Sequence, residues 1–146
     1  MSTPVRVDFY ILETHQNRGR YTLACRVVDK AYRTGNTVFL KLNNMEDAQL
    51  LDDLLWTFSQ SSFIPHPLCQ DRYKIDSPVA IGVSYPGAND IDVIISIADE
   101  PVVEFAQYQR IVEIVGSSDD EKALGRKQYK YYKDHGIEPN VHKINS

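Results

Sequence analysis

Five residues near the end of the chain combine positive charge with an aromatic ring at helical spacing: they are Lys122, Arg126, Tyr129, Lys130 and Lys133. Steps of three and four residues bring side chains onto one face of an α-helix. The segment from Lys122 to Lys133 contains five basic residues and no acidic one, although the whole chain has 16 Lys and Arg against 20 Asp and Glu. We use the name cationic stripe for the residues that share one helix face, Lys122, Arg126, Tyr129, Lys130 and Lys133. On a chain of net charge −4 it favours a short acidic peptide over long nucleic acid as the partner.

Lysines on a helix are often only a solvated surface, which is the alternative interpretation of the stripe. Three tyrosines in the same segment, Tyr129, Tyr131 and Tyr132, argue against it, because tyrosine is enriched at contact sites. We expect Tyr132 to face the interior together with Leu124.

Residues that could support catalysis or metal binding are sparse. His66 and Cys69 have i, i+3 spacing, but two potential ligands without a second pair do not make a zinc site. They are also the only nucleophile and base close in sequence, on a proline-bounded loop without a visible oxyanion donor. We expect solvated turn positions for the acidic residues Asp90, Asp92, Asp99 and Glu100. The sequence therefore predicts no metal, no cofactor and no enzymatic activity.

Alternating apolar runs and helical periodicities predict the elements that would position the stripe. Predicted strands cover residues 5–11, 37–42, 79–84, 92–97 and 110–115. Predicted helices cover residues 20–34, a segment capped by Asn44 that continues to residue 58, residues 102–108 and residues 119–135. This alternation predicts an α/β fold, a three-layer sandwich with a mostly parallel central sheet and helices on both faces. The turn between residues 13 and 19 has a single glycine, so this Rossmann-like arrangement lacks a phosphate-binding nucleotide loop.

The length of 146 residues and the 42% hydrophobic content fit one domain over residues 1–146. No signal peptide or membrane-spanning stretch is visible in the sequence. Two cysteines, Cys25 and Cys69, cannot form a disulfide framework, and Cys25 belongs to an amphipathic helix in which a buried thiol is expected. These features predict a cytoplasmic protein.

A connector of large apolar residues and prolines, WTFSQSSFIPHPLCQDRYKIDSP, follows the second helix. Connectors of this length are usually functional or irregular. Trp56 and Phe63 are candidates for an exposed apolar contact, because Pro65 and Pro67 prevent a regular hydrogen-bonding ladder. The alternative is that Phe63, Ile64 and Leu68 complete the sheet as one more strand.

Two segments, LLWTFSQSSFIPHPL (residues 54–68) and RKQYKYYKDHGI (residues 126–137), resemble the chi-subunit family of bacterial DNA polymerase III. Further landmarks occur in the same order: FYIL in the first strand, Gly35, a Ser-Pro-Val-x-Ile strand from Ser77 and an Asp-x-Ile-Ile-Ser strand from Asp92. Gln128, Lys133 and Ile137 stand where the family pattern has Arg, Arg and Phe.

This resemblance implies a non-enzymatic accessory subunit of the clamp loader that acts in DNA replication. Its implied partners are the psi subunit and the acidic C-terminal tail of single-stranded-DNA-binding protein. The implied tail site comprises Val115, Lys122, Arg126, Tyr129, Lys130 and Lys133. The implied psi-binding site comprises Trp56, Phe63, Ile64, Pro65, His66 and Leu68.

Two alternatives remain for these surfaces. A basic, aromatic helix is also typical of a module that binds single-stranded nucleic acid directly, although such a groove needs a basic track longer than one helix. The apolar connector could serve another partner in place of psi, such as a helicase. We expect no strong direct binding of nucleic acid and no membrane partner.

Overall fold

The computed structural model describes residues 5–13, 19–57, 68–69, 79–83, 91–103 and 105–144, with only the backbone described for residues 56, 57, 68 and 69. The elements in chain order are β1 (Arg6–Leu12), α1 (Gly19–Arg33), β2 (Val38–Lys41), α2 (Met45–Thr57), β3 (Leu68–Cys69), β4 (Val79–Gly82), β5 (Val93–Ser96), the 3-10 helix η3 (Phe105–Gln107), β6 (Arg110–Val115), α3 (Asp119–Asp134) and β7 (Asn140–Ile144).

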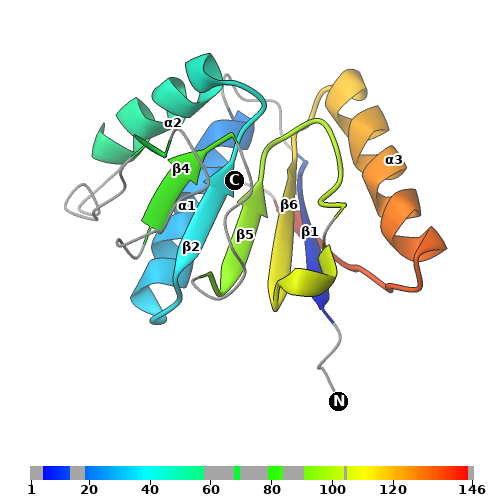
Figure 1. Cartoon of the computed structure of the whole chain (residues 1–146). Helices are drawn as coiled ribbons and strands as arrows, with labels where there is room; N and C mark the ends of the chain where they lie inside the picture. The colour runs from blue at the N-terminus through cyan, green and yellow to red at the C-terminus, as the bar shows by residue number, and fades with distance from the viewer. Residues whose placement is uncertain are drawn as a thin grey trace.

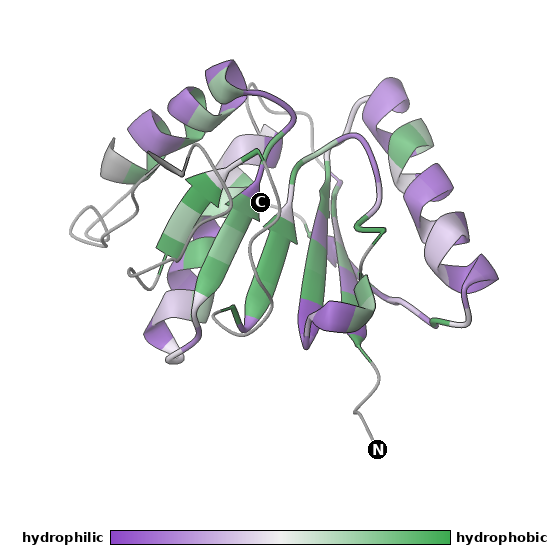
Figure 2. Cartoon of the chain, viewed as in Figure 1, coloured by the Kyte–Doolittle hydropathy of each residue, from purple (hydrophilic) through white to green (hydrophobic). Residues whose placement is uncertain are grey.

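One seven-stranded sheet runs through the molecule in the order β3-β4-β2-β5-β6-β1-β7. Every pairing between neighbouring strands is parallel. The interior strands β2, β4 and β5 are buried along their whole length, which explains their mostly apolar sequences. Figure 2 shows the same strands as the most hydrophobic part of the ribbon.

Two apolar clusters lie on the two faces of this sheet. One joins the sheet to α1 and α2, and the other joins it to α3 and to the segment around η3. Figure 1 shows α3 separated from α1 and α2 by the strands. The predicted three-layer α/β sandwich is therefore confirmed.

Local signals in the sequence predicted α1, α2 and α3, and strands β1, β2, β4, β5 and β6, to within a few residues. Gly35 follows α1 with φ of +88°, a left-handed conformation that glycine adopts readily and that commonly ends a helix. Asn44 Oδ1 accepts a hydrogen bond of 2.8 Å from the Asp47 N–H, as expected of an N-cap. Cys25 is buried, and this burial raises the pKa of its thiol to about 12. No helix in the described part of the chain has both the length and the apolar composition to cross a membrane.

Two elements differ from the sequence-based expectation. The helix expected over residues 102–108 is a single 3-10 turn, η3. Strand β7 was not predicted at all. Its five residues include none that is buried, so the sequence carries no apolar pattern there. Only its pairing with β1, more than 130 residues earlier in the chain, defines it as a strand.

A buried carboxylate holds β7 against the sheet. Asp8, on β1, is fully buried and lies 2.9 Å from Arg110 Nε, 3.0 Å from Arg6 Nε and 3.2 Å from His142 Nε2. Burial alone would raise the pKa of Asp8, but hydrogen bonds from His142 and Arg110 and the nearby positive charges lower it below the usual value. His142 is the contribution of β7 to this cluster.

Candidate functional site

A pocket of about 420 Å³ lies between α3 and the end of the sheet formed by β6, β1 and β7. Apolar atoms and three cationic side chains meet in it. Its lining residues are Phe9, Ile11, Glu13, Val115, Lys122, Gly125, Arg126, Tyr129 and Lys143.

Strand register accounts for the floor of the pocket. Ile11 pairs with Val115 on one side and with Lys143 on the other, so these three side chains lie next to one another on one face of the sheet. Phe9 lies two residues earlier on the same face, and its ring meets that of Tyr129 edge to face at 5.6 Å between centroids. The result is an apolar floor closed at one end by two aromatic rings.

Gly125 brings α3 close to the floor. It is buried, and a Cβ atom at this position would lie 2.9 Å from both methyl carbons of Val115. A side chain here would push the helix away from β6. Because glycine weakens a helix by about 1 kcal/mol relative to alanine, its presence in the middle of α3 is explained by this close approach.

The rim of the pocket is cationic. Lys122 and Arg126 are supplied by α3 and Lys143 by β7, while Glu13, at the end of β1, is the acidic member of the lining. Lys122, Arg126 and Lys143 have no ion-pair partner among the residues that the structure describes. Their charges therefore remain available to an anionic ligand.

The structure gathers four of the six residues expected in the tail site, namely Val115, Lys122, Arg126 and Tyr129. The other two, Lys130 and Lys133, are exposed and do not line the pocket. Lys133 Nζ lies 3.5 Å from Glu138 Oε2 and 5.8 Å from the centre of the Tyr129 ring. Lys133 therefore contacts the Tyr129 ring through a cation–π interaction, although it does not line the pocket itself.

Sequence analysis missed the members of the pocket that come from β1 and β7. Phe9 and Ile11 belong to the alternating pattern of the first strand. That pattern predicts which side chains share a face of the strand, but it does not predict that α3 packs against this face. Lys143 could not be found because β7 itself has no sequence signal. Gly125 could have been noticed as a glycine inside an otherwise regular helical pattern.

The three tyrosines of α3 have three different environments. Tyr132 is fully buried, as predicted, whereas Leu124 is only partly buried. Tyr129 lines the pocket. Tyr131 lies on the other flank, where its ring packs on that of His135 at 4.2 Å and meets Phe105 at 6.4 Å.

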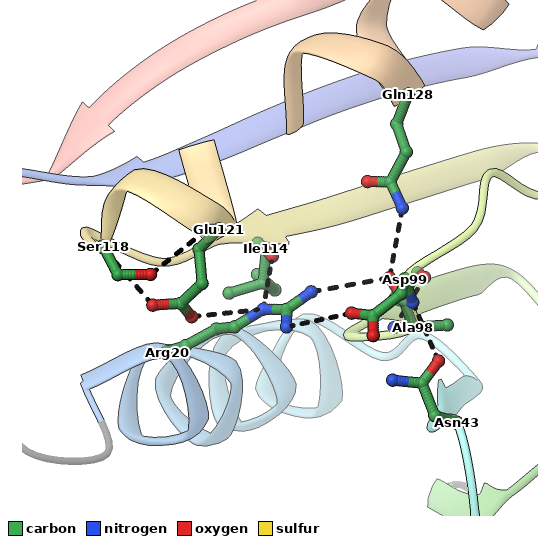
Figure 3. Close-up of polar contacts among 9 residues, drawn as sticks. Arg20, Asn43, Ala98, Asp99, Ile114, Ser118, Glu121 and Gln128 are labelled. Carbon is green, nitrogen blue, oxygen red and sulfur yellow. Dashed lines mark hydrogen bonds and ion pairs between the residues drawn. The ribbon is translucent and has the colours of Figure 1, made fainter. Parts of the chain in front are cut away.

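The first turn of α3 is fixed by a capping box. Ser118 Oγ accepts a hydrogen bond from the Glu121 N–H, and the Glu121 carboxylate accepts one from the Ser118 N–H. Figure 3 shows Arg20 of α1 reaching this turn, with Nε donating to the Ile114 carbonyl at 3.0 Å. Arg20 also lies 3.7 Å from Asp99 and 4.0 Å from Glu121. These contacts set the position of Lys122, the next residue along the helix.

A second set of polar contacts ties α3 to β6 and to the segment that follows β5. Gln128 Nε2 donates to the Ala98 carbonyl at 3.1 Å (Figure 3). The Tyr132 hydroxyl accepts a 2.8 Å hydrogen bond from the Val102 N–H and donates a 2.6 Å bond to Glu113 Oε2. Both helix residues are buried, so α3 is anchored by specific bonds as well as by apolar contact.

Glu113 is a buried carboxyl group in the interior of β6. Burial raises its pKa to about 8, even though hydrogen bonds from Tyr132 and Ser96 and the charges of Arg20 and Lys41 favour the ionised form. Its Oε1 atom has no hydrogen-bond partner among the described residues. At neutral pH the group is therefore largely protonated.

The candidates for catalysis and metal binding gain no support. The described residues contain no group of three or more His, Cys, Asp or Glu side chains that could hold a metal ion. Asp92 accepts a 2.9 Å hydrogen bond from the Thr37 N–H, and Asp99 lies beside Arg20, which are structural roles. Asp90 and His66 lie outside the described residues, and for Cys69 only the backbone is described.

Most of the residues expected in the psi-binding site lie outside the part of the chain that the structure describes. Phe63, Ile64, Pro65 and His66 lie outside the described residues. The backbone of Trp56 is in the last turn of α2, and that of Leu68 is in β3 beside β4. Of the additional strand that the alternative assigned to Phe63, Ile64 and Leu68, the described residues include only Leu68, which lies in β3.

Comparison with known proteins gives a consistent result over nearly the whole chain. The family model of the DNA polymerase III chi subunit, HolC, matches residues 5–140. DNA polymerase III subunit chi of Pseudomonas aeruginosa is 30% identical over 139 residues, which cover 95% of this chain and 96% of that protein. The subunit of the same name from Escherichia coli is 27% identical over 82% of each chain, and that from Haemophilus influenzae is 25% identical over 84% of this chain and 86% of its own.

Proposed function

The chain belongs to the DNA polymerase III chi-subunit family, and on that premise we propose that it binds the acidic C-terminal tail of single-stranded-DNA-binding protein in the pocket beside α3. It would act as a non-enzymatic accessory subunit in the bacterial cytoplasm during DNA replication. Through the psi subunit it would join this tail to the clamp loader.

The single observation that carries the proposal is the composition of the pocket. Phe9, Ile11 and Val115 form an apolar floor, and Lys122 and Arg126 stand at its rim without ion-pair partners among the described residues. A peptide end that carries an apolar last side chain, a terminal carboxylate and neighbouring aspartates complements both parts. The apolar side chain would fill the floor, while the carboxylates would pair with the cations.

The distribution of charge argues against direct binding of single-stranded nucleic acid, the second candidate function. A binding track for a strand needs cations along several nucleotides. Here the free cations of the pocket gather at its rim, and the chain as a whole carries a net charge of −4. A short anionic peptide end fits this arrangement better than a polynucleotide.

The tail site leads to a prediction about individual side chains. Arg126→Ala and Tyr129→Ala should each weaken binding of the tail peptide by about 1 to 3 kcal/mol, because one removes a charge from the rim and the other an aromatic wall. Isothermal titration calorimetry with a synthetic tail peptide measures the effect. We expect wild-type affinity to be roughly micromolar.

Lys127→Ala is the matched control, because Lys127 is an exposed cation of the same helix that does not line the pocket. It should change the affinity little. Equal losses in Arg126→Ala and Lys127→Ala, without a loss in Tyr129→Ala, would show that only diffuse charge is recognised. Tighter binding of a bare oligonucleotide than of the peptide would favour the nucleic-acid function.

The psi contact gives a separate prediction. We propose that Trp56, Phe63, Ile64, Pro65, His66 and Leu68 form an apolar surface for psi or for a helicase. Phe63→Ala should weaken that association by about 2 kcal/mol or more, as expected of a buried aromatic anchor. Pull-down with purified psi measures it, and tail-peptide binding should stay unchanged, because substitutions at sites without shared contacts act additively. If Phe63→Ala instead lowers stability by about 3 to 5 kcal/mol, the side chain belongs to the core.

A further inference from the structure

Strand β7 ends the sheet beside the pocket, and its outer backbone groups can be assigned. The Glu13 N–H donates to the Ile144 carbonyl at 2.8 Å, so Ile144 points its backbone groups toward β1. Backbone direction alternates along a strand. Asn140 and His142 therefore also face β1, and Val141 and Lys143 direct their N–H and C=O groups outward. No other strand among the described residues pairs with this outer edge.

The side chains of these two residues continue the pocket toward the edge. Lys143 pairs with Ile11 and Val141 pairs with Phe9, which places both on the pocket face of the sheet. Val141 is 45% exposed. In the described part of the chain, Val103 is the one other large apolar residue that is exposed. The apolar floor therefore extends past the pocket to an exposed valine on an unpaired edge.

We propose that the segment of the acidic tail that precedes its final residue pairs with the outer edge of β7 as an added strand. This inference rests on the proposed function, because the occupant is the same peptide. An exposed sheet edge gives affinity through the ligand's main chain, and side chains beside it give specificity. Val141 and Lys143 would offer one apolar and one cationic contact to the incoming segment.

Continuity and charge identify this occupant. Lys143 lines the pocket, so a peptide that leaves the pocket on that side would pass over the β7 edge. The strand reads Asn140, Val141, His142, Lys143, Ile144 and contains no acidic residue, so an acidic segment meets no repulsion from it. The pocket alone holds only the end of the tail, whereas the edge provides a track for the residues before it.

The decisive experiment compares peptides of two lengths on the wild-type protein. The last nine residues of single-stranded-DNA-binding protein should bind about threefold to tenfold more tightly than the last three, since one or two additional hydrogen bonds form. N-methylation of the nine-residue peptide at alternate backbone nitrogens upstream of the last three residues should remove this advantage. Methylation at the intervening positions should leave it intact, because those amides face away from β7.

A protein variant tests the same edge from the other side. Val141→Pro removes one outward N–H, and proline is tolerated in an edge strand when its nitrogen faces away from the ladder. It should reduce the affinity of the long peptide to that of the short one and leave the short peptide unaffected. Val141→Thr keeps the N–H and the branched shape, so it is the matched control. Melting curves of both variants establish that they fold.

The possible outcomes separate the two proposals. Equal affinity of the long and short peptides, or no effect of methylation at any position, overturns strand addition and leaves the pocket function intact. Failure of both peptides to bind overturns both. A wild-type protein that dimerises without peptide, and becomes monomeric as Val141→Pro, would show that a second copy of the chain occupies the edge and would also overturn the proposal.

Discussion

Tyr132→Ala is expected to lower the free energy of unfolding by about 3 to 5 kcal/mol, as large aromatic truncations in a core do. The side chain is completely buried. Its ring meets those of Phe9 and Phe105 edge to face, each at 6.0 Å between centroids. Its hydroxyl also joins α3 to the Val102 N–H and to Glu113. Removing it therefore leaves a cavity and two separated polar groups at the interface between α3 and the sheet.

Urea unfolding monitored by circular dichroism measures this change. Tyr131→Ala is the control, because the neighbouring tyrosine is only partly buried on the outer flank of the same helix, and its loss should be well below that of Tyr132. Tyr132→Phe separates ring from hydroxyl and should lose about 1 to 3 kcal/mol, the range for leaving buried partners unsatisfied. Similar losses for Tyr131→Ala and Tyr132→Ala would contradict the assigned role of Tyr132.

Glu113→Gln is expected to flatten the dependence of stability on pH between about pH 5 and 8. In the folded protein the pKa of Glu113 is raised from 4.5 to about 8 by burial. Over this range the folded chain retains a proton that the unfolded chain has released, so the free energy of unfolding falls as pH rises. Each pKa unit corresponds to about 1.4 kcal/mol, and the loss for wild type should be roughly 2 to 5 kcal/mol. Glutamine cannot ionise, so this loss should disappear.

Urea unfolding at pH 5 and pH 8 tests the expectation. The quantity to compare is the change between the two pH values within each protein, because glutamine adds a pH-independent loss of its own at the Oε1 position, where the described residues offer no hydrogen-bond partner. Asp8→Asn is the control of opposite sign. The lowered pKa of Asp8 makes its contribution present above about pH 4 and lost in more acidic solution, so the stabilisation that this variant removes is the one lost below about pH 4. An unchanged slope in Glu113→Gln would show that another group is responsible.

Sequence patterns predicted the sandwich because its interior strands are buried on both faces and are therefore mostly apolar. They predicted Lys122, Arg126 and Tyr129 in the pocket because helical spacing fixes which side chains share a face, but they missed Gly125 of the same helix. They could not predict Lys143, since β7 is a short edge strand whose structure depends on a partner at the other end of the chain. Glu113 had a usable signal: a charged residue within the apolar run Arg110–Val115 is expected to be buried when the strand lies inside the sheet.

The position of β1 between β6 and β7 has a consequence for how the protein is made. The first strand to be synthesised finds both of its partners in the last third of the chain, since Arg6 pairs with Arg110 and Asp8 pairs with Asn140. At bacterial translation rates, about 100 residues take on the order of 5 to 20 s to add. During that time both edges of β1 lack their native neighbours. The nascent chain therefore carries an apolar strand that cannot be paired until synthesis is nearly complete, and contacts of such long sequence separation also slow refolding.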